Sequence, residues 1–350
     1  MINPLKTTLK VGLIALTGLF SMNTAYAQFE DIGAFLRAGR EDATILTREY
    51  LKPFPTGFGA GLNAGFTETA QPKKLFGFSL QIRSSVALVP DADQSFDISA
   101  LNLQKIVVAP GENSFSPTIS GKDVSGPELI IYDDPNSPTR TELGRFTMPE
   151  GAGVALVPAP TIQASVGLIK NTDFTLRYAP KTTVGDFGEF SIIGAAIKHD
   201  IKQWIPGAKL LPVDLSVLVG FNRISVDGNL DVQPSNPNAG DDFSGQTVET
   251  STNTFVANAY VGKTLPFISV YGGVGYQKAT FDLDIKGNYP VEALGGYTTI
   301  NDPVSFSVES DASVHALAGF RIKLAFFAIY AEATFTDYVT ANAGIGFTFR

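Results

Sequence analysis

The sequence predicts an all-β protein, a transmembrane antiparallel β-barrel of about 12 strands within a range of roughly 10–14. Two observations carry this prediction: long segments in which apolar and polar residues alternate, and connections that are by turns short and long. A third is an N-terminal stretch typical of an export leader. The prediction includes a short N-terminal helical segment that can plug the lumen.

Composition narrows the chemistry. The net charge is −8 and only 17% of the residues are charged, so binding to nucleic acid through clustered basic residues is not expected. The chain has no cysteine, which excludes disulfides, thiol nucleophiles and thiolate metal sites. With two histidines in addition, we expect no metal and no cofactor.

Residues 1–27 have the pattern of a cleaved signal peptide. Lys6 and Lys10 precede an apolar run over 11–20, and Ala25-Tyr26-Ala27 forms a small-residue cleavage site. The run is too short for a transmembrane helix, which needs roughly 20 residues. The chain is therefore expected in the outer membrane, inserted there with the help of the barrel-assembly machinery.

Residues 28–56 are predicted to form the helical plug segment. Phe35, Leu36, Leu46 and Tyr50 fall near one helical face, and the prolines that follow at 53 and 55 end the pattern. The barrel is then expected over 57–350.

Strand signals dominate the rest of the chain. Over 339–350, six apolar residues lie on one face and six polar or small residues on the other. Similar segments predict ten further strands: 58–66, 76–88, 162–168, 174–178, 187–199, 213–221, 255–261, 267–286, 304–320 and 327–336. In 267–286 the alternation changes phase near Lys278, which suggests a β-bulge.

The connections divide into two kinds. Long polar ones lie at 90–158, 227–245 and 287–303, and short ones at 70–74, 170–173, 262–266 and 321–325. Bacterial barrels usually have an even number of strands, so an eleventh strand requires a twelfth. The long insertion at 90–158 is where it is expected, with Thr141–Met148 as the candidate.

The alternating faces have two interpretations. In a membrane barrel the apolar face meets lipid and the polar face lines the lumen, whereas in a soluble β-sandwich the apolar faces of two sheets pack together. Strand length and the leader favour the barrel. The polar residues expected to face the lumen are Arg83, Arg177, Glu309, Asp311, His315 and Glu332.

The segment 198–207 joins two predicted strands. Trp204, Ile201 and Ile205 are candidates for contact with the membrane interface, because an indole has an apolar body and a polar N–H. The alternative is an ordinary packed loop with one buried tryptophan.

Asp311, Ser313 and His315 lie on one strand face and could form the acid, nucleophile and base of an outer-membrane hydrolase. A polar stripe lining the lumen is the favoured interpretation, and G-x-S-x-G, H-E-x-x-H and phosphate-loop motifs are missing from the sequence. We therefore expect no enzymatic activity.

Several stretches resemble a family of uncharacterised outer-membrane barrels common in Bacteroidetes. They are residues 50–53, 59–63, 74–78, 171–173, 177–180, 198–207 and 211–214. The general plan is similar to that of the long-chain fatty-acid transporter family, in which an N-terminal segment plugs a barrel that passes apolar molecules. The resemblance implies no catalytic role.

The expected function is passage or binding of a small molecule, with a hydrophobic ligand as one option, by a barrel whose outer face contacts outer-membrane lipid. Two alternatives remain. One is a non-conducting barrel with a structural or secretion-associated role. The other is a soluble exported β-sandwich of adhesin-like character.

Overall fold

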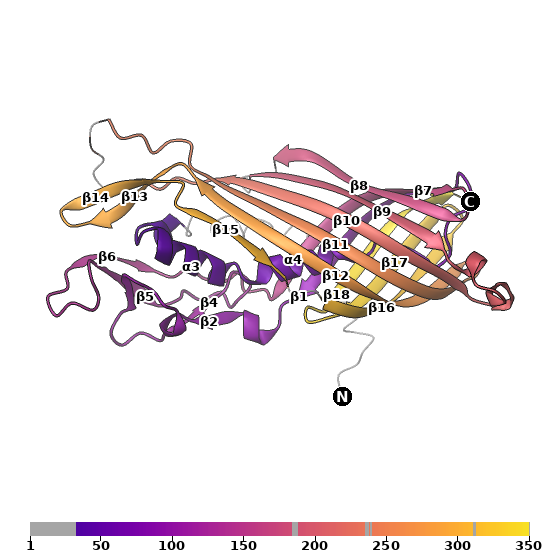
Figure 1. The fold of residues 1–350 in the computed structure, drawn as a ribbon, viewed down its shortest axis with the longest axis horizontal. Coiled ribbons are helices and arrows are strands. Elements are labelled where there is room, and N and C mark those ends of the chain that lie inside the picture. The colour runs from indigo at the N-terminus through magenta and orange to yellow at the C-terminus, as the bar shows by residue number, and fades with distance from the viewer. Residues whose placement is uncertain (1–32, 184–187, 235–237, 239, 311–312, 350) are drawn as a thin grey trace.

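The computed structural model describes residues 33–183, 188–234, 238, 240–310 and 313–349, so the predicted leader at 1–27 lies outside the described residues. Ten antiparallel strands form the barrel wall (Figure 1): β1 (Phe78–Leu88), β7 (Leu156–Leu168), β8 (Thr172–Thr183), β9 (Glu189–Asp200), β10 (Asp214–Asn229), β11 (Thr247–Thr264), β12 (Ile268–Lys286), β16 (Ser313–Leu324), β17 (Phe327–Phe335) and β18 (Thr340–Phe349). Each pairs with its neighbour in this order, and β18 pairs with β1, which closes the sheet.

Closure confirms the predicted barrel and shows that the β-sandwich alternative is wrong. Ten strands in the described wall lie at the low end of the predicted range. Two predicted strands account for the difference. Residues 58–63 are helical and 64–66 form a turn, and the strand within Thr141–Met148 is not part of the wall. The predicted strand 304–320 is divided into two strands, of which β16 belongs to the wall.

The two ends of the barrel differ. Connections of two or three residues join β7 to β8, β11 to β12 and β16 to β17 at one end, where β18 also terminates. We call this the short-turn end. The half of the barrel wall next to it is called the lower half, and the half next to the opposite end is called the upper half. The opposite end carries an elongated cap (Figure 1), built from residues 89–155 and from the extension that follows β12.

The cap contains three small sheets. β2 (Ser95–Asp97) pairs with β4 (Phe115–Pro117), and β3 (Ile106–Val108) pairs with β5 (Glu128–Tyr132), which pairs with β6 (Glu142–Thr147). The hairpin of β13 (Asn288–Ala293) and β14 (Gly296–Asn301) follows β12, and β15 (Val304–Glu309) returns along it. The candidate twelfth strand is thus β6 in the cap.

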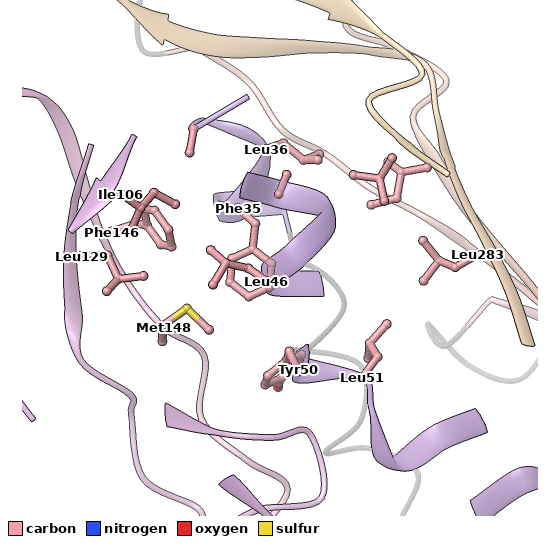
Figure 2. Close-up of a cluster of buried hydrophobic side chains, with 14 of the residues drawn as sticks. Phe35, Leu36, Leu46, Tyr50, Leu51, Ile106, Leu129, Phe146, Met148 and Leu283 are labelled. Atoms are coloured by element: carbon pink, nitrogen blue, oxygen red, sulfur yellow. The ribbon is translucent and has the colours of Figure 1, made fainter. Parts of the chain in front are cut away.

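Helix α3 (Arg40–Tyr50) is the centre of the cap. Leu46, Tyr50 and the nearby Phe35 are fully buried between the small sheets and upper β12 (Figure 2). The Asp42 carboxylate, in its first turn, accepts hydrogen bonds from the backbone N–H groups of Gln104 and Lys105 at 2.7 and 2.8 Å. Because one core includes the helix, the cap sheets and the barrel extension, the helix is a fixed part of the fold.

Helix α4 (Pro53–Asn63) lies inside the barrel, in contact with β1, β7, β10, β11, β12 and β18. Three glycines allow this close approach. A Cβ atom would lie 2.5 Å from Val157 at Gly57, 2.5 Å from Ala279 at Gly59 and 2.8 Å from Ala159 at Gly61. Glycine at every second position also imitates a strand pattern, so the predicted strand 58–66 is wrong, and the boundary predicted at 57 falls within α4.

Over its lower half, the wall has apolar side chains on the outside and polar side chains on the inside, the reverse of a water-soluble protein. On β10, Val217, Val219 and Phe221 are exposed, whereas Ser216 and Asn222 are buried on the inner face. Each of the ten strands contributes exposed large apolar side chains in this way. A water-soluble protein hides such residues, so an exposed belt of this size is typical of a surface that meets lipid.

The polarity switches faces higher in the wall. On β12, Val274 and Tyr276 point outward, but Phe281 and Leu283 point inward and are buried. The register with β11 runs without a shift, so the predicted bulge near Lys278 is wrong for β12. The phase change instead marks the level at which the outer face changes from apolar to charged and the inner face from polar to apolar.

Candidate functional site

Residues 64–74 continue from α4 through the lumen to the start of β1. They are called the plug segment from here on, and they are distinct from the helical plug predicted over 28–56. Two buried arginines on the wall hold their main chain. Arg177 donates to the carbonyl oxygens of Leu62 and Ala64, the latter at 2.8 Å, and its guanidinium lies 3.6 Å from the centre of the Phe66 ring. Arg83 donates to the Thr67 carbonyl at 2.9 Å.

Carboxylates complete this network. Glu332 accepts hydrogen bonds from the backbone N–H of Gly65 at 2.8 Å and from the Tyr271 hydroxyl at 2.9 Å. Glu68, on the plug segment, pairs with Lys73 and lies 3.5 Å from Arg321. Apart from the Arg321 Nε, which has no partner in the described residues, these buried groups satisfy one another, as a dry interior requires.

A second ion pair lies nearer the short-turn end. Lys198 is 3.1 Å from Asp173, and the same carboxylate accepts a 2.6 Å hydrogen bond from the backbone N–H of Lys73. The free space in this part of the lumen is about 10 Å³, which is about the minimum for one water molecule. The lower lumen is therefore packed.

Of the residues predicted to face the lumen, Arg83, Arg177, His315 and Glu332 lie on the inner face of the wall and are buried. Sequence reasoning missed Glu68 and Lys73 because they lie on the plug segment, where no strand periodicity marks a lumen-facing position. Lys198 was missed because the sequence left the phase of its strand ambiguous.

Glu309 does not face the lumen, contrary to the prediction. It points outward on β15, and its carboxylate is 2.7 Å from Lys278. Between the pairs Thr280–Glu309 and Gln277–Ser313, β12 advances three positions and its partner four, so one extra residue reverses the faces. Asp311 lies outside the described residues.

His315 is held by a neighbour across one strand. Its Nε2 is 2.9 Å from Asn258 Oδ1, and the strand between them carries Gly275, where a Cβ atom would overlap both groups. Ser313 accepts a 3.3 Å hydrogen bond from Thr336 instead of contacting the imidazole. In the described part of the chain, the serine–histidine contact of the hydrolase hypothesis is not formed.

Trp204 and Ile205 are exposed at the short-turn end, and Ile201 is half-buried. The Trp204 indole N–H donates to His199 Nε2 at 2.8 Å, which fixes the ring at the edge of the wall. Leu210, in the same connection, is also exposed. The position of this apolar cluster next to the lipid-type belt is compatible with the predicted interface role, which stays a prediction.

The upper inner wall is apolar. Phe190 and Ile192 on β9 lie beside Ile224 and Val226 on β10, and the row continues to Phe281 on β12. Phe54 and Phe58 of α4 face this row and leave a narrow hollow of about 20 Å³, comparable to one water molecule. The inner surface of the upper barrel is thus apolar and is covered by one face of α4.

One junction of the wall is incomplete next to this surface. β7 and β8 pair only from Gln163–Arg177 to Leu168–Thr172, so in the described residues the upper part of β7 (156–162) does not pair with the upper part of β8 (178–183). We call these unpaired edges the seam. Ala159 of β7 and Ala179 of β8 belong to the apolar cluster behind it.

Prolines explain the seam. Odd-numbered residues of β7 bond to β1, as shown by the 2.8 Å bond from Gly167 N to Gly77 O, so even-numbered N–H groups point toward β8. Both Pro158 and Pro160 therefore lack the donor that the β8 side requires. If the register continued, Pro160 would face Pro180, another residue without an N–H.

A separate polar hollow of about 320 Å³ opens at the cap end and is here called the mouth pocket. It lies beside α4, between Asn63 on the helix and Gln277 on β12, and the β17–β18 turn forms part of its rim. On one wall, Tyr338 donates to Asp93 at 2.9 Å. Burial, with this hydrogen bond, raises the pKa of the Tyr338 hydroxyl, so the group remains a donor.

No group of three or more metal-ligating side chains occurs in the described ranges. None of the helices described is long and apolar enough to cross a membrane.

The fold is similar to solved barrels at low scores. The translocator domain of the autotransporter NalP from Neisseria meningitidis is 11% identical, with 90% of this chain and 99% of that chain covered and a TM-score of 0.29. The toluene transporter TbuX from Ralstonia pickettii is 9% identical, with 85% and 97% covered and a TM-score of 0.19.

No curated protein matches the chain. Residues 5–349, nearly the whole sequence, match a family described as a family of unknown function, DUF6588. This agrees with the resemblance of the sequence to an uncharacterised family. The chain therefore belongs to the DUF6588 family of unknown function.

Proposed function

We propose that this chain spans the outer membrane and passes or binds a small hydrophobic molecule, which moves between the cap and the lipid through the seam. The observation that carries the proposal is the position of the seam. It joins the apolar upper inner wall to the outer belt, and it lies above the packed polar network that closes the lumen.

Membrane placement is supported by length as well as polarity. From Phe267, just before β12, to Tyr276 on it, the outward apolar stretch covers ten residues, and a tilted strand needs about 9–11 to cross the hydrocarbon. Aromatic side chains gather at the short-turn end, where the rings of Phe78 and Phe349 stack with centres 4.7 Å apart. Phe221 and Phe255 pair at the upper limit of the belt, as expected for a second aromatic girdle.

The route through the seam follows from what each path would require. A molecule passing straight through the lumen would have to break the hydrogen bonds that Arg83, Arg177 and Glu332 make to the plug segment. A hydrophobic molecule leaving through the seam crosses no ladder of backbone hydrogen bonds, and it meets Leu62 and Ala159 on the way. Phe58 must shift to widen the hollow, because the space there is too small for a ligand at rest.

The test restores the missing donors. In the variant Pro160→Val/Pro180→Val, up to two ladder hydrogen bonds can form, each worth about 0.5–1.5 kcal/mol. We expect uptake of dodecanoate by proteoliposomes to fall about tenfold, since about 1.4 kcal/mol corresponds to that factor. The matched control, Pro117→Val in the cap, should leave uptake unchanged.

A disulfide provides an independent closure. The natural chain has no cysteine, so Pro160→Cys/Pro180→Cys introduces the only thiols. We expect oxidation to block uptake and reduction to restore it, whereas Val166→Cys/Phe174→Cys, in the paired part of the same two strands, should respond to neither. Uptake that is equal in the closed and open states would contradict the seam route.

A non-conducting barrel is the second candidate, favoured by the packed lower lumen. In this case the barrel is an anchor that displays the cap to partners. It predicts that wild-type proteoliposomes take up dodecanoate no faster than empty liposomes, and that the protein co-purifies with other envelope proteins. Uptake above the empty-liposome rate excludes it.

A further inference from the structure

The mouth pocket is accessible from one side of the barrel. β10, β11 and β12 extend far into the cap, but β17 ends at Phe335 and the turn over 336–339 leads directly into β18. The wall is therefore low on this side. Ser310, Ser313 and Thr336 place hydroxyl groups along the low rim, and the pocket beneath has a volume of about 320 Å³. This is the lower end of the range for ligand sites.

Two carboxamides in the pocket have hydrogen-bonding groups without a protein partner. Gln277 is 7% exposed, and its side chain makes no hydrogen bond within the described residues. Asn63 is 3% exposed; its Nδ2 donates to the Phe255 carbonyl at 3.2 Å, but its Oδ1 is fully buried and has no partner in the same set. A polar group left unpaired in a largely buried hollow costs free energy, so these unused amide groups indicate a polar occupant.

Four charged side chains around the pocket form two ion pairs. Lys52 lies 2.8 Å from Asp93, and Lys278 lies 2.7 Å from Glu309. Asp337, also in the lining, makes no ion pair within the described residues. An anionic ligand would have to displace one of the pairs and would meet Asp337, whereas the hydroxyl groups of an uncharged ligand can donate to Asp337 and bind the free amide groups without disturbing the pairs.

From these observations we propose that the mouth pocket is a binding site for a small, uncharged, polyhydroxylated molecule of sugar size. A carboxamide offers two donors and one acceptor oxygen, which matches neighbouring hydroxyls that both donate and accept. The rim hydroxyls supply further contacts of the same kind. This site is separate from the seam, because Asn63 and Gly59 lie on a different face of α4 from Phe54 and Phe58.

Titration calorimetry of the full chain in detergent tests the proposal, with glucose and maltose as probes and glycine and dodecanoate as charged comparisons. We expect saturable binding of at least one sugar. In Gln277→Leu and Asn63→Leu, which keep side-chain volume but remove the amide, affinity should fall at least tenfold. Gln104→Leu, an exposed cap position, should bind like the wild type.

Folding is checked for each variant by comparing the electrophoretic mobility of unheated and boiled protein. Thr336→Val, a milder change at the rim, should weaken sugar binding about threefold and covers the case in which an amide variant fails to fold. The proposal is overturned if neither sugar binds the wild type, if binding is unchanged in the folded amide and rim variants, or if glycine or dodecanoate competes for the same site. Because sugar binding does not depend on the seam, failure here leaves the uptake experiment independent.

Discussion

The lower and upper halves of the barrel wall are built from the same strands but use opposite rules. In the lower half of β10, Val219 is exposed and Asn222 is buried; in the upper half, Ile224 is buried and Arg223 is exposed. The lower half has an apolar exterior and a packed polar interior. The upper half has a polar exterior and an apolar interior continuous with the cap core.

This difference teaches that side-chain alternation alone does not say which face is inside. The solvent outside decides it: lipid outside requires an apolar exterior, whereas water outside requires an apolar interior. In the proposed membrane placement, the level of the switch marks the membrane boundary on the molecule. The seam and the mouth pocket both lie near this level. Here the apolar and polar faces of the wall exchange sides, and the inside of the barrel meets lipid or water.

The largest effect is expected from removing apolar volume on the two sides of the switch. Leu283 is fully buried inside the upper wall. The substitution Leu283→Ala should lower the free energy of unfolding by about 2–5 kcal/mol, because it leaves a cavity. Ile345→Ala removes similar volume from the lower exterior, where lipid fills the space, and should cost less than about 1 kcal/mol. Urea unfolding in lipid vesicles measures both; equal costs would contradict the assignment of faces.

How far the sequence predicted this arrangement depends on the segment. Five of the six apolar positions of the alternation lie in β18, all on its outward side, and in lower β10 the same rule holds. The rule failed at Gly57–Gly61, where glycines needed for close helix packing look like every second position of a strand. It failed at Glu309 because one extra residue in a connection reverses the faces, which periodicity within either strand cannot reveal.

The candidate sites were less predictable than the fold. The seam depends on Pro160 and Pro180 lying at positions that would face each other if the β7–β8 register continued, and this needs the register between two strands. The prolines themselves were visible in the sequence and could have indicated an edge. The mouth pocket combines Asn63, on a segment predicted to be a strand, with Gln277, so its two amides could be brought together only by the structure.

Charge placed on the exterior is the next test, with an intermediate effect. Val219→Lys puts a charge in the lipid-type belt and should lower the free energy of unfolding of the barrel in membranes by about 2–4 kcal/mol. This loss would reduce the yield of folded barrel. Ser225→Lys is on the same face of the same strand but above the switch, and should leave the yield unchanged. The amount of barrel that resists unfolding in unheated samples gives the comparison. Similar losses from both changes would mean that the belt extends above the switch.

The smallest effect concerns the short-turn end, where the belt meets the other membrane surface. Trp204 is the only tryptophan of the chain, so its fluorescence reports on this position alone. We expect lipids brominated near the headgroup to quench its emission more strongly than lipids brominated near the chain ends, because an indole rests at the interface with its N–H on the polar side. Trp204→Phe keeps an apolar ring but loses the 2.8 Å hydrogen bond to His199, so the free energy of unfolding should fall by about 0.5–1.5 kcal/mol. Emission quenched by aqueous iodide but by neither lipid would place the Trp204 connection in water, and the lower limit of the belt would then have to be drawn at the Phe78–Phe349 stack.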